Sequence, residues 1–159
     1  PDAPTPPNIS TETASPLLPR NARAILLVED NPVNQLVGSM MIKRVGHHVT
    51  IAADGMEAIN SLAARRFDLI LMDMQMPVMD GLEATAAIRA RETHDRAPRI
   101  PIIALTANAQ TRDRELCMAA GMDDYLSKPF EIAMLREKLA RWMPDDREQD
   151  ASVGITEKT

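Results

Sequence analysis

The sequence contains a single cysteine, Cys117, and no apolar run that approaches the roughly 20 residues a helix needs to cross a bilayer. One cysteine excludes an internal disulfide and a zinc site built from thiolates, and it agrees with a reducing compartment. The N-terminal residues also lack the apolar core and small-residue cleavage site of a signal peptide. We therefore expect a cytoplasmic segment that makes no contact with a membrane.

Basic residues are too few and too dispersed for a nucleic-acid-binding surface. Residues 23–143 carry 15 basic and 16 acidic side chains, so this part is nearly neutral although the whole chain has a net charge of −5. Residues 144–159 carry five acidic and two basic side chains. Because binding to a phosphate backbone requires a stripe of Lys and Arg, we expect no nucleic-acid partner.

Proline and charge divide the chain into three parts. Residues 1–21 hold six of the 12 prolines, which predicts a flexible Pro-rich linker. Residues 22–143 are long enough to form one domain with its own core, and residues 144–159 are predicted to be a disordered acidic tail. Because the sequence begins at Pro1 without Met, we expect it to be part of a longer protein.

Five short apolar segments alternate with five segments of helical pattern. The strands are predicted at residues 24–28, 48–52, 69–72, 102–106 and 124–126. The helices, counted from their predicted N-caps where the sequence shows one, are at residues 31–45, 54–65, 80–93, 111–120 and 130–143. Five consecutive strand–helix units predict a parallel α/β sheet with helices on both faces and right-handed crossovers.

The strand at residues 69–72 is apolar at every position, which is typical of a strand buried on both faces. Asp73 follows it at the carboxyl edge, where ligands of open parallel sheets bind. Polar residues also end three other strands: Glu29 and Asp30 after the first, Thr106 after the fourth, and Lys128 after the fifth. We expect these side chains to converge on one edge of the sheet.

This set of side chains predicts a magnesium site with phosphoryl-transfer chemistry. Three neighbouring carboxylates would repel one another unless a divalent cation compensated their charge, and oxygen ligands without His or Cys favour Mg²⁺. With the metal and Lys128 nearby, a carboxylate could attack phosphorus, and Asp73 is the best placed nucleophile. Thr106 and Lys128 could each hold a phosphoryl oxygen.

Other acidic residues favour a structural interpretation. Asp54 and Asp80 each precede a glycine and have Glu three residues later, so helix capping is favoured over chemistry. Asp30 could also be a cap, but Asn31 followed by Pro32 fits that role better and leaves Asp30 free.

The polar strand ends belong to longer motifs. These are Val28-Glu29-Asp30-Asn31, the Asp73 strand with Met76-Pro77 and Met79-Asp80-Gly81 after it, Leu105-Thr106-Ala107, and residues 121–130 with Lys128-Pro129-Phe130. Taken together, these motifs resemble the receiver domains of response regulators, the CheY-like family, over roughly residues 22–143. The resemblance implies a flavodoxin-like (βα)5 three-layer sandwich with the strand order 2-1-3-4-5 known from CheY. It also implies a cis Lys128–Pro129 bond.

The same resemblance implies that Asp73 accepts a phosphoryl group from a phosphohistidine. It places Mg²⁺ on Asp30, Asp73 and the backbone carbonyl of Gln75, with Glu29 assisting through water, and gives Lys128 and Thr106 catalytic roles. The domain would then catalyse its own phosphorylation and dephosphorylation, which leaves open whether it is called an enzyme.

Two further roles rest on the resemblance. Thr106 and Tyr125 are implied to couple phosphorylation to the surface of the fourth helix, fifth strand and fifth helix. Gln75 and Asn108, two residues past Asp73 and Thr106, match positions that tune hydrolysis of the acyl phosphate. The residue by itself favours a plain core aromatic for Tyr125, and the switch role is added by the resemblance alone.

Residues 30–35 and 74–77 resemble receivers carried by hybrid sensor histidine kinases. The expected partner is a kinase dimerisation or phosphotransfer domain, or a histidine phosphotransfer protein. The apolar residues of the first helix extend over a wider arc than one core-facing stripe requires. One side of the helix carries Val37, Met41 and Val45. The additional apolar residues Val33, Leu36 and Met40 predict a docking surface. Covering of nearby loops is the alternative.

Two other functions stay open at this point. The chain could be an interaction or autoinhibitory module that acts without phosphorylation. Against this, the sequence keeps every residue of the expected site: Glu29, Asp30, Asp73, Thr106 and Lys128. It could also be a flavodoxin-like or nucleotide-binding enzyme, but no Gly-rich phosphate loop follows the first strand, and acidic residues stand where a phosphate would need amides.

Overall fold

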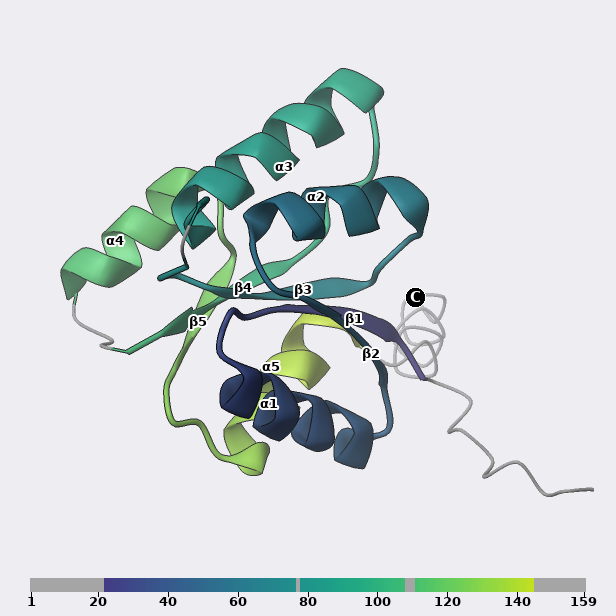
Figure 1. The fold of residues 1–159 in the computed structure, drawn as a ribbon, viewed down its shortest axis with the longest axis vertical. Coiled ribbons are helices and arrows are strands. Elements are labelled where there is room, and N and C mark those ends of the chain that lie inside the picture. Colours follow the sequence, from purple (N-terminus) through teal and green to yellow (C-terminus); the bar gives the residue numbers. More distant parts are fainter. Residues whose placement is uncertain (1–21, 77, 108–110, 145–159) are drawn as a thin grey trace, which may run out of the picture.

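The computed structural model describes residues 22–76, 78–107 and 111–144, which form a parallel sheet of five strands between two layers of helices (Figure 1). The strands are β1 Ala24–Val28, β2 His48–Ala52, β3 Leu69–Asp73, β4 Ile102–Thr106 and β5 Asp124–Ser127. Their order is β2-β1-β3-β4-β5, and every neighbouring pair is parallel. The predicted (βα)5 sandwich and its strand order are confirmed.

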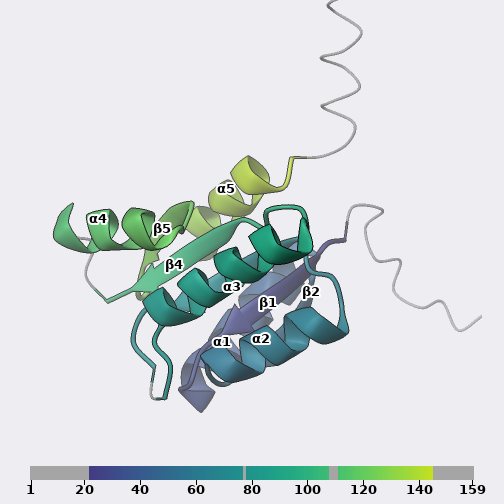
Figure 2. The same ribbon diagram turned by 90° about the horizontal axis from the view of Figure 1, so that it is seen from above.

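The helices are α1 Pro32–Val45, α2 Gly55–Ala64, α3 Gly81–Asp95, α4 Thr111–Ala120 and α5 Ile132–Trp142. Helices α1 and α5 cover one face of the sheet, and α2, α3 and α4 cover the other (Figures 1 and 2). No helix among the described residues is long and apolar enough to span a membrane.

Two apolar clusters hold the layers together, one on each face of the sheet. Successive residues of a strand point to opposite faces, so Ile25 and Leu27 of β1 pack towards α1 and α5, whereas Leu26 and Val28 pack towards α2 and α3. Strand β3 is buried along its whole length, as its continuous apolar run predicted, and β4 is buried in the same way.

Helix caps set where the chain enters each helix. Asn31 caps α1 by accepting a hydrogen bond from the Val33 amide (2.9 Å), which leaves Asp30 outside the cap as predicted. Asp54 and Asp80 also cap their helices, accepting from the amides of Glu57 and Glu83. The capping interpretation of both acidic residues is confirmed.

Two predicted helix ends were wrong by two residues. Helix α5 begins at Ile132 rather than at residue 130, because Glu131 keeps an extended backbone and is the N-cap. Helix α3 continues past Thr93 to Asp95, because Arg96 adopts the left-handed conformation (φ 53°) and its amide bonds the carbonyls of the last turn. The predicted linker and acidic tail lie outside the described residues.

Candidate functional site

The three predicted carboxylates meet at the carboxyl edge of the sheet. Strands β1 and β3 are neighbours with Val28 opposite Met72, so the residues that follow them come together. One carboxylate oxygen from each of Glu29, Asp30 and Asp73 lies within 4.8 Å of the others. Glu29 and Asp73 are buried, and Asp30 is exposed to solvent.

Lys128 reaches this cluster from the end of β5. Its Nζ donates to Glu29 Oε2 at 2.8 Å and lies 3.0 Å from Asp73 Oδ1. The Lys128 amide donates to the Thr106 carbonyl, which fixes the residue beside β4, and the Lys128–Pro129 bond is cis. One ammonium thus bridges two buried carboxylates.

Thr106 lies at the end of β4, where Leu105 is opposite Asp73 in the register of the sheet. The residue is 4 % exposed, and its Oγ1 has no hydrogen-bond partner among the described residues. A buried hydroxyl left unpaired costs about 1–3 kcal/mol. It lines the same cavity, about 390 Å³, as Asp73 and Lys128, so an oxygen bound there could accept its hydrogen bond.

Burial and Lys128 act in opposite directions on the two buried acids. Burial raises the pKa of the Asp73 carboxyl, and the hydrogen bond from Lys128 offsets this only in part. For Glu29 the burial effect is outweighed by Lys128 and by the Asn31 amide, so the pKa of this carboxyl is lowered. The pKa of Lys128 is raised, because its bonds to both carboxylates outweigh its burial.

Backbone and amide donors hold the turn between β1 and α1. Glu29 Oε1 accepts from the Asn31 amide (3.2 Å) and from Asn34 Nδ2 (3.4 Å), and the Glu29 carbonyl accepts from Gln35 Nε2 (2.7 Å). Sequence reasoning did not identify Asn34 and Gln35 as supports of Glu29; their only sequence signal was their place in the 30–35 motif.

The loop after β3 is tied to Asp73. The Gln75 amide donates to Asp73 Oδ1 at 3.2 Å. Gly81, at the start of α3, lies so close to this loop that an added Cβ would stand 2.3 Å from the Asp73 carbonyl oxygen. Only glycine fits there without moving the backbone that carries Asp73. Asn108, the other residue predicted to tune hydrolysis, lies outside the described residues.

The residues present fit a magnesium ion. Three carboxylates against one ammonium leave a net negative charge, and the three acidic side chains grouped here offer hard oxygen ligands. The unpaired Thr106 hydroxyl and the Lys128 ammonium lie on the same cavity, so the site offers ligands for a cation and donors for an anion side by side.

Tyr125, a predicted switch residue, is not part of this cluster. It lies half-buried on β5, with the Arg114 guanidinium 4.4 Å and the Lys138 ammonium 5.2 Å from its ring centroid. These cations come from α4 and α5, so Tyr125 belongs to the surface shared by α4, β5 and α5.

The predicted docking residues of α1 are exposed: Val33 by 67 %, Leu36 by 60 % and Met40 by 61 %. Val37, which the pattern placed on the core side, is also 46 % exposed, so that prediction was wrong. The reason is that the small residue Gly38 lies against Leu27, where a Cβ would stand 2.9 Å from Leu27 Cδ2, so the buried stripe runs through Gly38 and Ile42.

Comparison with known proteins agrees with this geometry. Residues 25–140 match the family model of the response regulator receiver domain. The chain is 40 % identical over 127 residues to the sensor protein GacS of Pseudomonas syringae pv. syringae, and 40 % identical over 152 residues to a probable histidine kinase 1 of Oryza sativa subsp. indica. These matches cover 80 % and 78 % of this chain but only 14 % and 16 % of the relatives, so the chain spans about one-seventh of their length.

Solved structures share the fold. The receiver domain of the sensor histidine kinase PA1611 from Pseudomonas aeruginosa PAO1, which has a magnesium ion in its active site cleft, is 52 % identical with a TM-score of 0.70, over 78 % of this chain and 99 % of that one. The receiver domain of Ssk1 from Saccharomyces cerevisiae, solved with the histidine phosphotransfer protein Ypd1, is 32 % identical with a TM-score of 0.73, over 77 % and 90 %. The chain therefore belongs to the response regulator receiver domain family.

Proposed function

We propose that this domain accepts a phosphoryl group from a phosphohistidine onto Asp73. The observation that carries the proposal is the bridging of Asp73 and Glu29 by Lys128, with the unpaired Thr106 hydroxyl on the same cavity. Lys128 and Thr106 thus offer two hydrogen-bond donors on the cavity that Asp73 lines, and such donors favour phosphoryl transfer because it depends on positioning and charge stabilisation.

Asp30, Asp73 and the backbone carbonyl of Gln75 would hold Mg²⁺, with Glu29 assisting through water. The bound ion would neutralise charge on the incoming phosphoryl oxygens. The magnesium in the cleft of the 52 % identical PA1611 receiver supports this assignment.

In the transfer step an Asp73 Oδ attacks phosphorus, a P–O bond forms, and the P–N bond to the donor imidazole breaks. The imidazole leaves with the electron pair of that bond and takes up a proton from solvent. Lys128 then pairs with one phosphoryl oxygen in place of Asp73, and Thr106 Oγ1 donates a hydrogen bond to a second phosphoryl oxygen. The product is an acyl phosphate on Asp73.

The exposed apolar residues of α1 are the proposed docking surface for the phosphohistidine donor. Val33 lies in the first turn of the helix that follows Glu29 and Asp30, so a helical bundle seated on Val33, Leu36 and Met40 would bring its histidine beside the site. The Ypd1–Ssk1 complex supports a phosphotransfer protein, and the kinase relatives support a dimerisation domain within a hybrid histidine kinase.

Further roles are proposed on the same basis. Thr106 and Tyr125 would couple the phosphorylated state to the α4–β5–α5 surface. Gln75, exposed next to Asp73, and Asn108 would tune hydrolysis of the acyl phosphate. We place the domain in the cytoplasm, with which the free buried thiol of Cys117 is consistent.

Acetyl phosphate and Mg²⁺ provide the test, with Asp73→Asn as the variant and Asp95→Asn as the control. Asp95 is exposed on α3 and pairs only with Arg91 among the described residues. The wild type and the Asp95 variant should take up radiolabelled phosphate, and the Asp73 variant should take up none. Stable label on the folded Asp73→Asn protein would contradict the proposal.

A further inference from the structure

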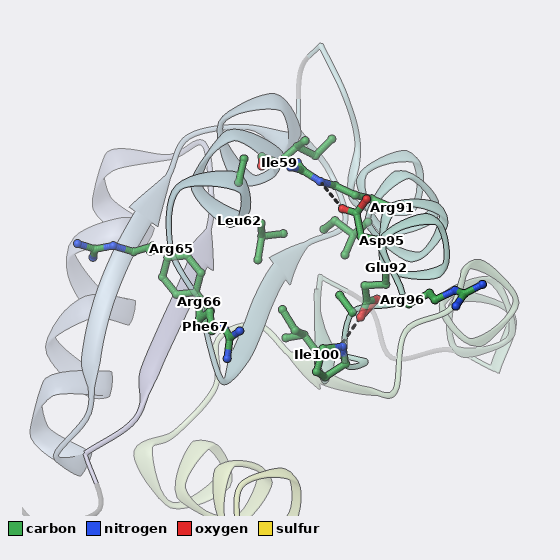
Figure 3. Close-up of a pocket in the computed structure, with 14 residues that line it drawn as sticks. Ile59, Leu62, Arg65, Arg66, Phe67, Arg91, Glu92, Asp95, Arg96 and Ile100 are labelled. Atoms are coloured by element: carbon green, nitrogen blue, oxygen red, sulfur yellow. Dashed lines mark hydrogen bonds and ion pairs between the residues drawn. The ribbon is translucent and has the colours of Figure 1, made fainter.

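A groove between α2 and α3 lies at the edge of the sheet opposite the acidic site. Its volume is about 570 Å³. Ile59 and Leu62 of α2 project towards α3, and Phe67 and Ile100, from the segments that lead into β3 and β4, close its lower side (Figure 3). Ile59, Leu62 and Ile100 are only half-buried, so apolar surface is left in contact with water.

The rim of the groove is positively charged. Four arginines line it, against the two acidic residues Glu92 and Asp95. Both acids are already paired, Glu92 with Arg89 and Asp95 with Arg91. Arg66 and Arg96 have no carboxylate partner within residues 22–76, 78–107 and 111–144. Their charge is therefore available to an acidic ligand.

Residues 145–159 carry the complementary charge. They include five acidic and two basic side chains, together with the apolar residues Val153 and Ile155. Helix α5, which precedes this segment in the chain, ends at the sheet edge where the groove lies, since the Trp142 indole donates to Asp124 at the start of β5 (2.8 Å). The nine steps from one residue to the next between Pro144 and Val153 span up to about 30 Å when extended.

We propose that residues 145–159 dock in this groove of their own chain. Val153 and Ile155 would cover the apolar surface of Leu62 and Ile100, and the acidic side chains would lie against Arg66 and the other arginines of the rim. A short tether gives the segment an effective concentration in the millimolar range, so modest contacts suffice. Contacts between exposed charges also make the docking sensitive to salt.

Limited trypsin digestion of the full chain tests the proposal through cleavage after Arg147. If the segment is docked nine-tenths of the time, cleavage is slowed about tenfold, because it follows the population of the open form. Arg66→Glu, which reverses an exposed charge at the groove, should accelerate cleavage after Arg147 by roughly fivefold to tenfold. Ile155→Ser should do the same without any change in the folded domain. Mass spectrometry of the products measures the rate of cleavage after Arg147 in the wild type and in each variant.

Arg136→Glu is the matched control, since Arg136 is exposed on α5 and the change in charge is identical. Cleavage after Arg20 is the internal reference. An unchanged rate after Arg147 in both the Arg66 and Ile155 variants would overturn the proposal. Equal acceleration by Arg66→Glu and Arg136→Glu would also overturn it, because net charge rather than the groove would then hold the segment. If the Arg66 and Ile155 variants accelerated cleavage after Arg20 but not after Arg147, residues 1–21 rather than residues 145–159 would occupy the groove, which would also overturn the proposal.

Discussion

The hydroxyl of Thr106 is the least satisfied polar group of the acidic site. It is buried at the end of β4 and lacks a hydrogen-bond partner within the described part of the chain. Such a group destabilises the folded state unless a ligand pairs with it. An oxygen atom bound in the cavity could pair with this hydroxyl and remove that cost.

Thr106→Val is therefore expected to stabilise the resting domain by about 1 kcal/mol and to slow phosphoryl transfer by tenfold or more. Valine has nearly the same shape and removes the unpaired hydroxyl. Urea unfolding measures the first effect and the rate of phosphate incorporation the second.

Thr85→Val is the control for this experiment. The Thr85 hydroxyl is also buried, but it donates to the Gly81 carbonyl at 2.7 Å. Replacement of Thr85 by Val should therefore lower the free energy of unfolding, whereas Thr106→Val should raise it. Destabilisation by Thr106→Val to the same degree would show that the Thr106 hydroxyl is already paired in the resting domain.

At the scale of elements, a buried ionic contact joins β5 to α5. Asp124, at the start of β5, accepts hydrogen bonds from Lys138 Nζ (2.9 Å) and Trp142 Nε1 (2.8 Å) of α5. Burial alone would raise the pKa of the Asp124 carboxyl, but Trp142, Lys138 and the Tyr125 amide outweigh it, so the pKa is lowered.

Because the folded-state pKa of Asp124 lies below its unfolded value, the carboxylate stabilises the fold at pH values above the ordinary pKa of 3.8. The stabilisation is lost as the pH falls through the lowered pKa. Asp124→Asn should lower the free energy of unfolding at pH 7 and should make its decrease between about pH 5 and pH 2 smaller. Urea unfolding across this pH range measures both effects. A wild type and variant with parallel pH profiles would contradict the assignment.

For the whole molecule, the acidic site is assembled from the ends of β1, β3, β4 and β5, so ligand binding there should stabilise the entire fold. Mg²⁺ at 100 times its dissociation constant is expected to raise the free energy of unfolding by about 2.7 kcal/mol. Asp30→Asn should remove most of this gain, whereas Asp95→Asn should keep it. Thermal unfolding with and without Mg²⁺ measures the difference, and an equal gain in the Asp30 variant would contradict the proposed ligand set.

The sequence predicted which residues meet at the site, because strand ends of a parallel sheet share one edge. Glu29, Asp73, Thr106 and Lys128 each directly follow or end a strand, so their convergence needed only the topology. The bridge from Lys128 to Glu29 was not predictable, since 99 residues separate the two and no local pattern records the distance.

Close approaches of the backbone were also beyond sequence reasoning. Gly81 was read only as part of a motif, although its role is to clear the Asp73 carbonyl. Val37 was placed towards the core because its spacing fits a helical stripe, but the contact of Gly38 with Leu27 turns that side of α1 outward. Both depend on the separation of packed elements, which residue periodicity does not specify.

The most direct test of the central claim is to locate the phosphoryl group. The chain would be phosphorylated with acetyl phosphate and Mg²⁺, the acyl phosphate reduced with borohydride, and the modified residue found by peptide mass spectrometry. We predict reduction at Asp73 alone, and only when Mg²⁺ is present. Modification of another carboxylate, or equal modification of Asp73 without Mg²⁺, would contradict the account.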